Sequence, residues 1–572
     1  MKKLLASTVV LLSLGFSANA EPIPEYPQLY AGPTNAPNGT ISYTSIIGGT
    51  NGYRSSLSGH NVENGKVTKV FTCKSMQDTE CAKANVIIYK SVLGMCSGTT
   101  STDCISSFNA IDSNGNTFPG KLLPSVFSEK DGSFEGSRQQ NIPSGGQSPL
   151  VNIPGAPHAF GTTYLPVVIV TGGGDNRNFY PLQDLAVRLY AVKVVQGQFN
   201  FTPSTMDLNA SDYNNPFAVN WYGSDTRCVE NDSTNCIVPT ELPINFRFSI
   251  TFKTSIPIPG WMHGQVVDPS IQIASTGSDY LTTIAAKPIL NPMISVTVPI
   301  ENLSADFLRP YQYLQFASQT NCDKSSFPMD LSTCQYTEVI NDYGQRDFDE
   351  FLKWLSYAND TAFINPARWD VVLDPKYKNI GNCAIPENQV GGMVSTNAPM
   401  YLAGPPAWNP NNLTLDYKVA APHYLSDKSI NQGSYDLAIN SKLARCLYKF
   451  TNAPISASLT IQSIEGKNQI ATTVVRESNG FLYLSAKGFT FSSPVLSVKL
   501  FGEPIPEPVV QPTPTPSPTE STQPVVTLTS QPTPKVVVTK KPVIVKSVTC
   551  INGKNSKVFK GSTCPKGWKP KK

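Results

Sequence analysis

The stretch CKSMQDTEC, from Cys73 to Cys81, holds two cysteines with seven residues between them. The same interval returns in CSGTTSTDC (Cys96–Cys104) and in CVENDSTNC (Cys228–Cys236). All three interiors are polar and rich in Asp, Asn, Ser and Gly, which favour turns. Apolar, β-prone runs flank them, such as VTKVF before Cys73 and ANVIIY after Cys81. Each copy therefore predicts a strand, a pinched surface loop and a returning strand.

Twelve cysteines in one chain raise the choice between metal sites, redox centres and disulfides. Zinc sites usually place cysteines two to four residues apart with histidines nearby, and redox centres use C-x-x-C. The chain has no C-x-x-C, and none of its four histidines adjoins a cysteine. We therefore predict disulfides, although connectivity cannot be fixed from sequence. The hypothesis of neighbour pairing gives Cys73–Cys81, Cys96–Cys104, Cys228–Cys236, Cys322–Cys334, Cys383–Cys446 and Cys550–Cys564.

The first twenty residues, MKKLLASTVVLLSLGFSANA, are typical of a secretory signal. Lys2 and Lys3 precede an apolar run, and Ala18 and Ala20 suit a cleavage site after residue 20. No later stretch approaches the roughly 20 apolar residues of a membrane span. We expect a secreted, extracellular protein with no transmembrane helix in the mature chain, and the cysteine content agrees with an oxidising compartment.

Charge is distributed unevenly along the chain. Charged residues make up only 15% of the sequence, against a usual value of about 25%. The formal net charge is +4, yet residues 521–572 contain 11 lysines and no acid, so the remainder is acidic. An acidic body with a basic tail predicts an anionic partner for the tail. We expect that partner to be an anionic cell-envelope polymer and not a nucleic acid.

Composition and pattern predict a mainly β, multi-domain protein. We expect disulfide-stapled antiparallel β-sandwich-like domains with a few short helices, followed by a disordered Pro/Thr linker. The predicted parts are a signal peptide (1–20), an N-terminal β-rich domain (21–250), a second β-rich region (251–340), a mixed helix/loop region (341–450), a C-terminal β-hairpin region (451–502), the linker (503–545) and a basic Cys-pair tail (546–572).

Several strands can be placed individually. The apolar run Leu165–Val170 predicts a buried strand. The segment Asp184–Phe201 fits a helix or a strand, and its β-branched second half favours a strand. In the hairpin region, Asn479 and Gly480 suit a tight turn between two strands.

Two short helices are also predicted. Arg346–Asp360 carries apolar residues on one helical face and acidic residues in its first turn, where the helix dipole favours them. Ser441–Lys449 predicts a second helix, with Leu443, Cys446 and Leu447 facing inward.

The tail sequence TCINGKNSKVFKGSTCPKGWKPKK resembles the short lysine-rich, Cys-paired tails of uncharacterised exported actinobacterial surface proteins. The segments beginning LARCLYKFTNAPISASLTI and GWMHGQVVDPSIQI are similar to regions of the same group. The resemblance covers about a third of the chain. It implies an exported surface protein, and it carries over no activity and no catalytic residue.

The sequence motifs that could indicate a nucleotide, metal or catalytic site are weak. VVIVTGGGDNRN (Val167–Asn178) is Gly-rich but lacks phosphate-loop spacings, so a mobile surface turn is the favoured interpretation. The polar loops Leu208–Asn215 and Phe108–Phe118 could ligate calcium through oxygen, and the second places Asp112, Asn114 and Asn116 at alternate positions. Without an acid at the end of an EF-hand, turn chemistry is favoured and calcium stays open. There is no G-x-S-x-G and no HExxH. The four histidines His60, His158, His263 and His423 are scattered, and we interpret them as surface or hydrogen-bonded residues.

Aromatic and acidic side chains each allow both a functional and a structural interpretation. Trp221, Tyr222 and Trp408 stand in polar, loop-like contexts and are candidates for glycan contact, although core packing explains them at least as well. A carboxylate pair for glycoside cleavage depends on three-dimensional separation. Asp347, Asp349 and Glu350 lie near Trp354 in sequence, but a charged helix start is the simpler explanation.

The favoured hypothesis is an adhesin-type binding protein at the cell surface. Its lysine-rich tail would hold it to the envelope, and glycans are candidate ligands of the body. The alternative is a secreted polysaccharide hydrolase. No catalytic residue, cofactor or metal ligand is assigned. The lysines of the envelope-binding tail are Lys554, Lys557, Lys560, Lys566, Lys569, Lys571 and Lys572.

Overall fold

A computed structural model describes the body and parts of the tail, and the chain separates into two compact units, Met1–Pro506 and Glu507–Lys572. The described residues are 39–44, 53–64, 66–98, 101–127, 132–175, 178–201, 227–312, 319–320, 335–339, 344–362, 367–450, 456–462, 468–470, 472–491, 495–501, 547–552, 555–560 and 569–570. The predicted signal peptide and linker lie outside these ranges. The domain boundaries expected within residues 21–502 stay a prediction.

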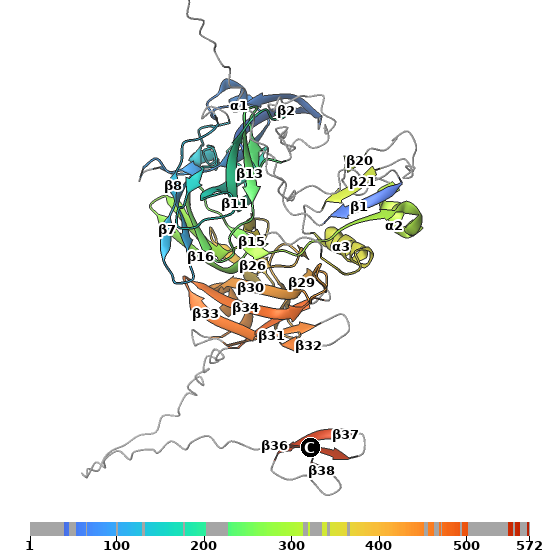
Figure 1. Ribbon diagram of the computed structural model, residues 1–572. Helices are drawn as coiled ribbons and strands as arrows, with labels where there is room; N and C mark the ends of the chain where they lie inside the picture. Colours follow the sequence, from blue (N-terminus) through green and yellow to red (C-terminus); the bar gives the residue numbers. More distant parts are fainter. Residues whose placement is uncertain are drawn as a thin grey trace, which may run out of the picture. The chain divides into compact units, whose positions relative to one another are not determined.

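The fold is mainly β, as predicted, and its largest sheet, the central sheet, collects strands from most of the first unit. Neighbours along this sheet are antiparallel except β15 and β26, which run parallel. Figure 1 shows β11, β15, β26, β30 and β34 following one another through the sheet. In spatial order the strands are β3 (Lys66–Thr72), β2 (Ser56–Glu63), β4 (Val86–Val92), β10 (Thr163–Gly174), β11 (Leu182–Gln196), β23 (Asp370–Asp374), β15 (Gly260–Gln265), β26 (Val390–Thr396), β30 (Gln432–Asn440), β34 (Phe481–Thr490) and β33 (Thr472–Ser478).

The predicted strands of this sheet are confirmed. Leu165–Val170 lies inside β10, and the ambiguous segment from Asp184 is the strand β11. Asn479 and Gly480 form the turn that joins β33 to β34, and both have positive φ. Short strands extend the sheet beside β10 and β11: β8 (Lys121–Leu122), β9 (Val151–Asn152), β12 (Glu230–Asn231) and β13 (Asn235–Thr240).

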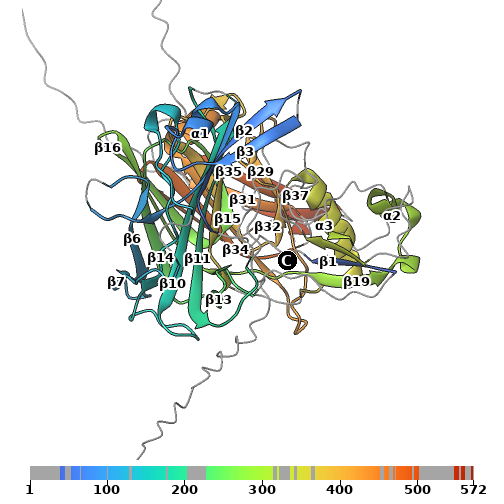
Figure 2. The ribbon, with the colours of Figure 1, turned by 90° about the horizontal axis from the view of Figure 1, so that it is seen from above.

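A second sheet packs on one face of the central sheet. Its strand β14 reads RFSITFKT, and every second residue is buried, including Phe248, Ile250 and Phe252. These side chains join Val187 and Leu373 of the central sheet in one hydrophobic core. Figure 2 shows β6 and β14 beside β10 and β11. The strands are β16 (Val267–Thr276), β17 (Asp279–Lys287), β14 (Arg247–Thr254), β6 (Cys104–Ile111), β5 (Gly94–Met95) and β7 (Thr117–Pro119).

A third sheet covers the opposite face at the other end of the central sheet. Within β26, Met393 belongs to the core against the second sheet, whereas Val394 belongs to the core against the third sheet. Both faces are covered there, so every residue of β26 is buried. The strands are β27 (Met400–Tyr401), β29 (Thr414–Ala420), β35 (Val495–Phe501), β31 (Ser456–Gln462), β32 (Asn468–Ile470) and β28 (Ala407–Asn409).

A small sheet and two helices join the third sheet's core. The helix α3 (Gln345–Tyr357) confirms the first predicted helix, and its Trp354 stacks on Tyr43 with ring centroids 5.2 Å apart. Tyr43 lies in β1 (Thr40–Thr44), which pairs with strands some 250 or more residues away in sequence. The other members are β19 (Ser295–Pro299), β21 (Gln335–Val339), β20 (Gln319–Thr320) and α2 (Ala305–Gln312). Short elements elsewhere are α1 (Thr79–Lys83), β18 (Ile289–Leu290), β22 (Ala367–Arg368), β24 (Asn379–Ile380), β25 (Cys383–Ala384) and the 3-10 turns Arg138–Gln140 and Ile300–Asn302.

The second predicted helix is α4 (Ser441–Tyr448). The side chain of Asn440 accepts hydrogen bonds from the N–H groups of Lys442 and Leu443, which fixes the start of the helix. Leu443 and Leu447 are buried as expected. Cys446, by contrast, is exposed on the outer side of the helix, because its partner approaches from the neighbouring β24–β25 hairpin.

Four predicted disulfides are confirmed. The three short loops close as Cys73–Cys81, Cys96–Cys104 and Cys228–Cys236, and the long one closes as Cys383–Cys446. The other two predicted pairs, Cys322–Cys334 and Cys550–Cys564, fall outside the described side chains. Disulfides of this kind are consistent with an extracellular protein.

The second unit contains a small antiparallel sheet of β37 (Asn555–Lys560), β36 (Ser547–Asn552) and β38 (Lys569–Pro570). Lys557, Lys560 and Lys569 lie in these strands, while Lys554, Lys566, Lys571 and Lys572 lie outside the described residues. Within the described ranges, no helix combines the length and apolar character that crossing a bilayer requires.

Candidate functional site

A polar pocket of about 690 Å³ lies on the central sheet at β11, β23 and β15. Successive residues of a strand point to opposite faces. Leu185, Val187, Val371 and Leu373 therefore face the hydrophobic core, and the alternate residues face the pocket. We define the polar pocket by Asp184, Arg188, His263, Asp370 and Asp374, which all line it.

Arg188 and Asp370 form an ion pair across the two strands. They are direct partners in the β11–β23 register, and Arg188 Nε lies 2.8 Å from Asp370 Oδ2. Both side chains are at most 17% exposed. Burial alone would lower the pKa of Arg188, but Asp370 and a hydrogen bond with Tyr53 raise it well above its usual value. The guanidinium is therefore a fixed positive charge in the pocket wall.

The carboxyl groups of Asp184 and Asp374 have different surroundings. Burial, opposed by the charge of Arg188 and assisted by the carboxylates of Asp370 and Asp374, raises the pKa of Asp184 to about 6. Asp374 has its own cation, because Lys376 Nζ lies 2.5 Å from Oδ2 and the Lys376 N–H donates to Oδ1. Asp184 therefore keeps its proton at a pH where ordinary carboxyl groups have lost it.

Hydrogen-bonded side chains complete the pocket. His263 is 5% exposed, and its Nδ1 lies 3.0 Å from the hydroxyl of Tyr401. Gln265 donates to the carbonyl of Ala398 and accepts a 2.6 Å hydrogen bond from Asn291. These contacts fix the orientation of each side chain, so the pocket is organised before any ligand arrives.

A polar row leads from the pocket along the central sheet. In the registers of β4, β10 and β11, Thr171 lies opposite both Lys90 and Asp184. Burial lowers the pKa of Lys90 to about 8, with Arg188 acting in the same direction and Glu230 opposing. Lys90 is thus electrostatically coupled to the polar pocket and to a second cluster around Glu230.

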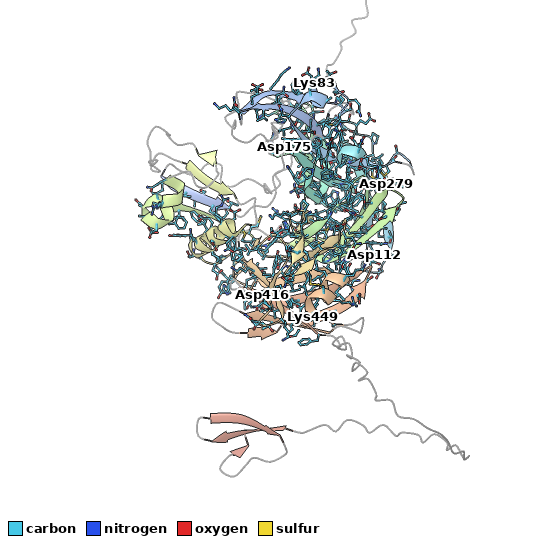
Figure 3. All side chains as sticks on the ribbon, turned by 180° about the vertical axis from the view of Figure 1, so that it is seen from behind. Lys83, Asp112, Asp175, Asp279, Asp416 and Lys449 are labelled. Carbon is cyan, nitrogen blue, oxygen red and sulfur yellow. A yellow bond between two sulfur atoms is a disulfide. The ribbon has the colours of Figure 1, made fainter. Side chains whose placement is uncertain are left out.

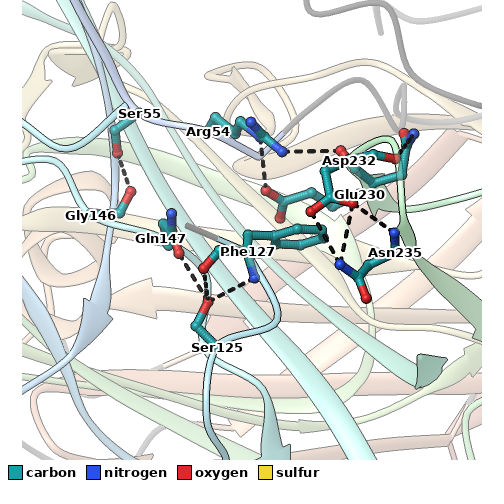
Figure 4. A network of polar contacts seen from close by, with 10 residues as sticks. Arg54, Ser55, Ser125, Phe127, Gly146, Gln147, Glu230, Asp232 and Asn235 are labelled. Atoms are coloured by element: carbon teal, nitrogen blue, oxygen red, sulfur yellow. Dashed lines mark hydrogen bonds and ion pairs between the residues drawn. The ribbon is translucent and has the colours of Figure 1, made fainter. Parts of the chain in front are cut away.

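That second cluster holds a buried arginine and a buried glutamate (Figure 4). Arg54 and Glu230 are 4% and 2% exposed, and Arg54 Nε lies 3.5 Å from Glu230 Oε1. The guanidinium also lies over the rings of Phe127 and Phe201, at 5.4 and 4.7 Å, and donates to the carbonyl of Asn231. Burial raises the pKa of Glu230 to about 7, although Arg54 and Lys90 oppose the shift.

The predicted aromatic candidates do not meet at this site within the described residues. Trp221 and Tyr222 lie outside those residues. Trp408 lies in β28, is half-buried, and packs edge-on against Tyr448 with ring centroids 4.9 Å apart. Its role in glycan contact stays a prediction.

The histidines and the acidic helix start have structural partners. His60 pairs with Ser58, His158 with the carbonyl of Thr163, and His423 with Asp360. Only His263 of the four lines the polar pocket. In α3, Glu350 accepts a 3.0 Å hydrogen bond from the indole of Trp354, and Asp347 pairs with Arg346.

Two loop interpretations have different outcomes. Asp112 accepts hydrogen bonds from the N–H groups of Asn114 and Asn116, so turn chemistry explains this loop. The loop Leu208–Asn215 lies outside the described residues. The glycine run is not a surface turn: Gly172–Gly174 continue β10 and pair with β4. A Cβ at Gly172 would meet the ring of Tyr89, which explains the missing side chain.

Sequence reasoning missed the residues of the polar pocket. A signal existed, because β11 contains DLAVR (Asp184–Arg188) and β23 reads DVVLD, so each strand places charged residues four positions apart among apolar ones. Two charges on one face of a buried strand indicate a polar site. Among the described side chains, no three His, Cys, Asp or Glu residues gather into a group that could hold a metal ion.

Comparison with known proteins found no matching family model, no matching curated protein and no matching solved structure. The resemblance to actinobacterial surface proteins therefore stays a prediction.

Proposed function

We propose that this chain is an exported binding protein of the cell surface, whose polar pocket takes a glycan and whose lysine-rich tail holds it to anionic envelope polymers. The observation that carries the proposal is the polar pocket itself. Three strands distant in sequence bring carboxylate, guanidinium, imidazole and amide groups into one cavity.

Glycan binding is supported by the donors and acceptors of the pocket. Asp370 and Asp374 accept hydrogen bonds, Arg188 and the rim lysines donate them, and His263 can do either. A sugar presents many hydroxyl groups that both donate and accept. A pocket of about 690 Å³ is within the usual range for small-ligand sites.

The rim of the pocket offers a direct test of binding. Lys378 lines the pocket and is exposed, so Lys378→Ala leaves the fold intact. Loss of one charged hydrogen bond should weaken binding about tenfold or more. We expect a glycan array to identify bound sugars and calorimetry to measure the loss. Lys66→Ala, on the exposed edge strand β3, is the matched control. No bound glycan, or equal affinity in both variants, would contradict the proposal.

The tail supports retention at the envelope. Residues 521–572 carry 11 lysines and no acid, and the tail belongs to a compact unit of its own. Many weak contacts between lysines and a polyanion add up to stable association, and salt screens each of them.

Deleting residues 546–572 should release the protein from cells into the medium. The deletion removes most of the tail lysines and with them the attraction to the envelope. High salt should release the full-length protein in the same way, and immunoblots of cell and medium fractions measure both effects. A truncated protein that stays on the cells in high salt would show that the tail is not the tether.

A further inference from the structure

Asp184 and Asp374 lie on the adjacent strands β11 and β23. The β11–β23 register pairs Ala186 with Val372 and Leu185 with Leu373, and one further step brings Asp184 opposite Asp374. Both residues line the pocket. Directly opposed residues of antiparallel strands have Cβ atoms about 4.5–5.5 Å apart.

We propose that the polar pocket hydrolyses glycosidic bonds by double displacement, with Asp184 as the general acid and base and Asp374 as the nucleophile. This inference rests on the proposed function, because it requires the pocket to be the glycan site. Retaining glycosidases hold their two carboxyl groups about 5–5.5 Å apart, a separation that side chains from opposed positions of paired strands can reach.

The surroundings of the two carboxyl groups assign their roles. Asp184 is half-buried, has two other carboxylates beside it and keeps its proton up to a pH of about 6 because of its raised pKa. Asp374 forms an ion pair with Lys376 instead. Two carboxyl groups in such contrasting environments are the usual arrangement of an acid and a nucleophile.

Asp370 is a poorer candidate for the nucleophile. Its carboxylate is fixed by the Arg188 guanidinium, and both side chains are at most 17% exposed. Lys376 is 68% exposed, so its pair with Asp374 is weak and can rearrange when a sugar enters.

The reaction balances with water as the only co-reactant. Asp184 gives its proton to the glycosidic oxygen while the Asp374 carboxylate attacks the anomeric carbon. The bond from that carbon to the leaving oxygen breaks, and a glycosyl ester forms on Asp374. The Asp184 carboxylate then takes a proton from water, whose oxygen attacks the anomeric carbon and releases Asp374. Both residues return to their starting states, and the sugar leaves with a new hemiacetal end.

New reducing ends measure this activity. Full-length protein should release them from at least one of chitin, cellulose, xylan and peptidoglycan glycan strands, with the rate falling above a pH of about 6 as Asp184 loses its proton. Asp184→Asn should lower kcat about 10²–10⁴-fold and remove that fall, and Asp374→Asn should remove turnover. Asp112→Asn is the control; this residue, labelled in Figure 3, lies in the turn after β6.

The outcomes separate the two proposals. If a glycan binds but no reducing ends are released, the catalytic inference is wrong and the proposed binding function stands. Neither binding nor turnover overturns both. Turnover that Asp184→Asn leaves undiminished, or that survives Asp374→Asn, overturns the assignment of residues. Nuclear magnetic resonance of the wild-type product gives a check that needs no variant, since an inverted anomer contradicts double displacement.

Discussion

Replacing Arg54 by alanine is expected to lower the free energy of unfolding by about 3–5 kcal/mol at pH 8, because it leaves the buried carboxyl of Glu230 without its nearest cation. The substitution also removes the guanidinium that lies over Phe127 and Phe201. At pH 5, where Glu230 is protonated, the loss should be smaller by up to about 1.4 kcal/mol, because one pH unit separates the Glu230 pKa of about 7 from pH 8.

The pH dependence follows from the direction of the Glu230 pKa shift. Burial raises this pKa from 4.5 in an ordinary setting to about 7 in the folded protein. Such a carboxyl contributes its full stability below the unfolded-state pKa and loses it as the pH rises through the folded-state value. Removing Arg54 raises the folded-state pKa further, so the variant loses more stability than the wild type between pH 5 and pH 8.

Urea unfolding at pH 5 and pH 8, followed by tryptophan fluorescence, measures the effect. Lys69→Ala is the matched control, because it breaks the Lys69–Glu80 pair, whose side chains are 60% and 58% exposed. An exposed pair contributes less than about 1 kcal/mol, with no step near pH 7. An equal loss for Arg54→Ala at both pH values would show that charge burial at Glu230 is not the cause.

Local patterns were sufficient to predict the elements whose stability is local. The three short disulfides, β10 and the helices α3 and α4 each carry their own signal, in spacing, β-branched residues or helical periodicity. The returning strand predicted at each short loop is found at Cys228–Cys236, where β12 pairs antiparallel with β13, but β5 and β6 at Cys96–Cys104 run parallel. Helix α3 begins one residue before the predicted start and ends at Tyr357, three residues before the predicted end, whereas α4 ends one residue before its predicted end. Differences of one or two residues are usual at helix termini.

Pairings between distant segments could not be predicted in this way. β1 bonds to β19 and β21 at the same time, and β15 runs parallel to β26. Nothing within residues 40–44 specifies either neighbour, because register depends on which hydrophobic face each strand buries. The same limit applies to the polar pocket, since Arg188 and Asp370 are 182 positions apart.

The aromatic candidates show why composition misleads. Trp408 stands in the polar sequence PPAWNPNN, yet its ring packs against Tyr448 and the core of the third sheet. The charged residues of β11 indicate the position of the pocket better than the aromatic candidates do. A charged side chain inside a buried strand needs a polar or charged partner, whereas an aromatic residue in a loop needs none.

Removing the Cys383–Cys446 disulfide should destabilise the first unit more than removing any of the short ones. The bridge spans 63 positions, whereas Cys96–Cys104 spans 8. On the chain-entropy relation, opening the long loop raises the conformational entropy of the unfolded chain and so lowers the free energy of unfolding by about 4 kcal/mol. The same relation gives about 2.5 kcal/mol for the short loop. The double variants Cys383→Ser/Cys446→Ser and Cys96→Ser/Cys104→Ser, unfolded in urea side by side, measure the difference.

The comparison also tests what holds α4 in place. Cys446 is on the exposed side of the helix, while Leu443 and Leu447 are buried against the core. Serine at position 446 therefore leaves the packing of α4 unchanged. Each double variant also places one serine at a buried position, Cys383 or Cys104, both 6% exposed, so that cost is common to the two variants and the expected difference comes from the unfolded chain. If both double variants lose the same stability, loop length has no influence. The buried leucines and the Asn440 cap would then be sufficient to hold this helix in place. The disulfide would only link residues that folding has already brought together.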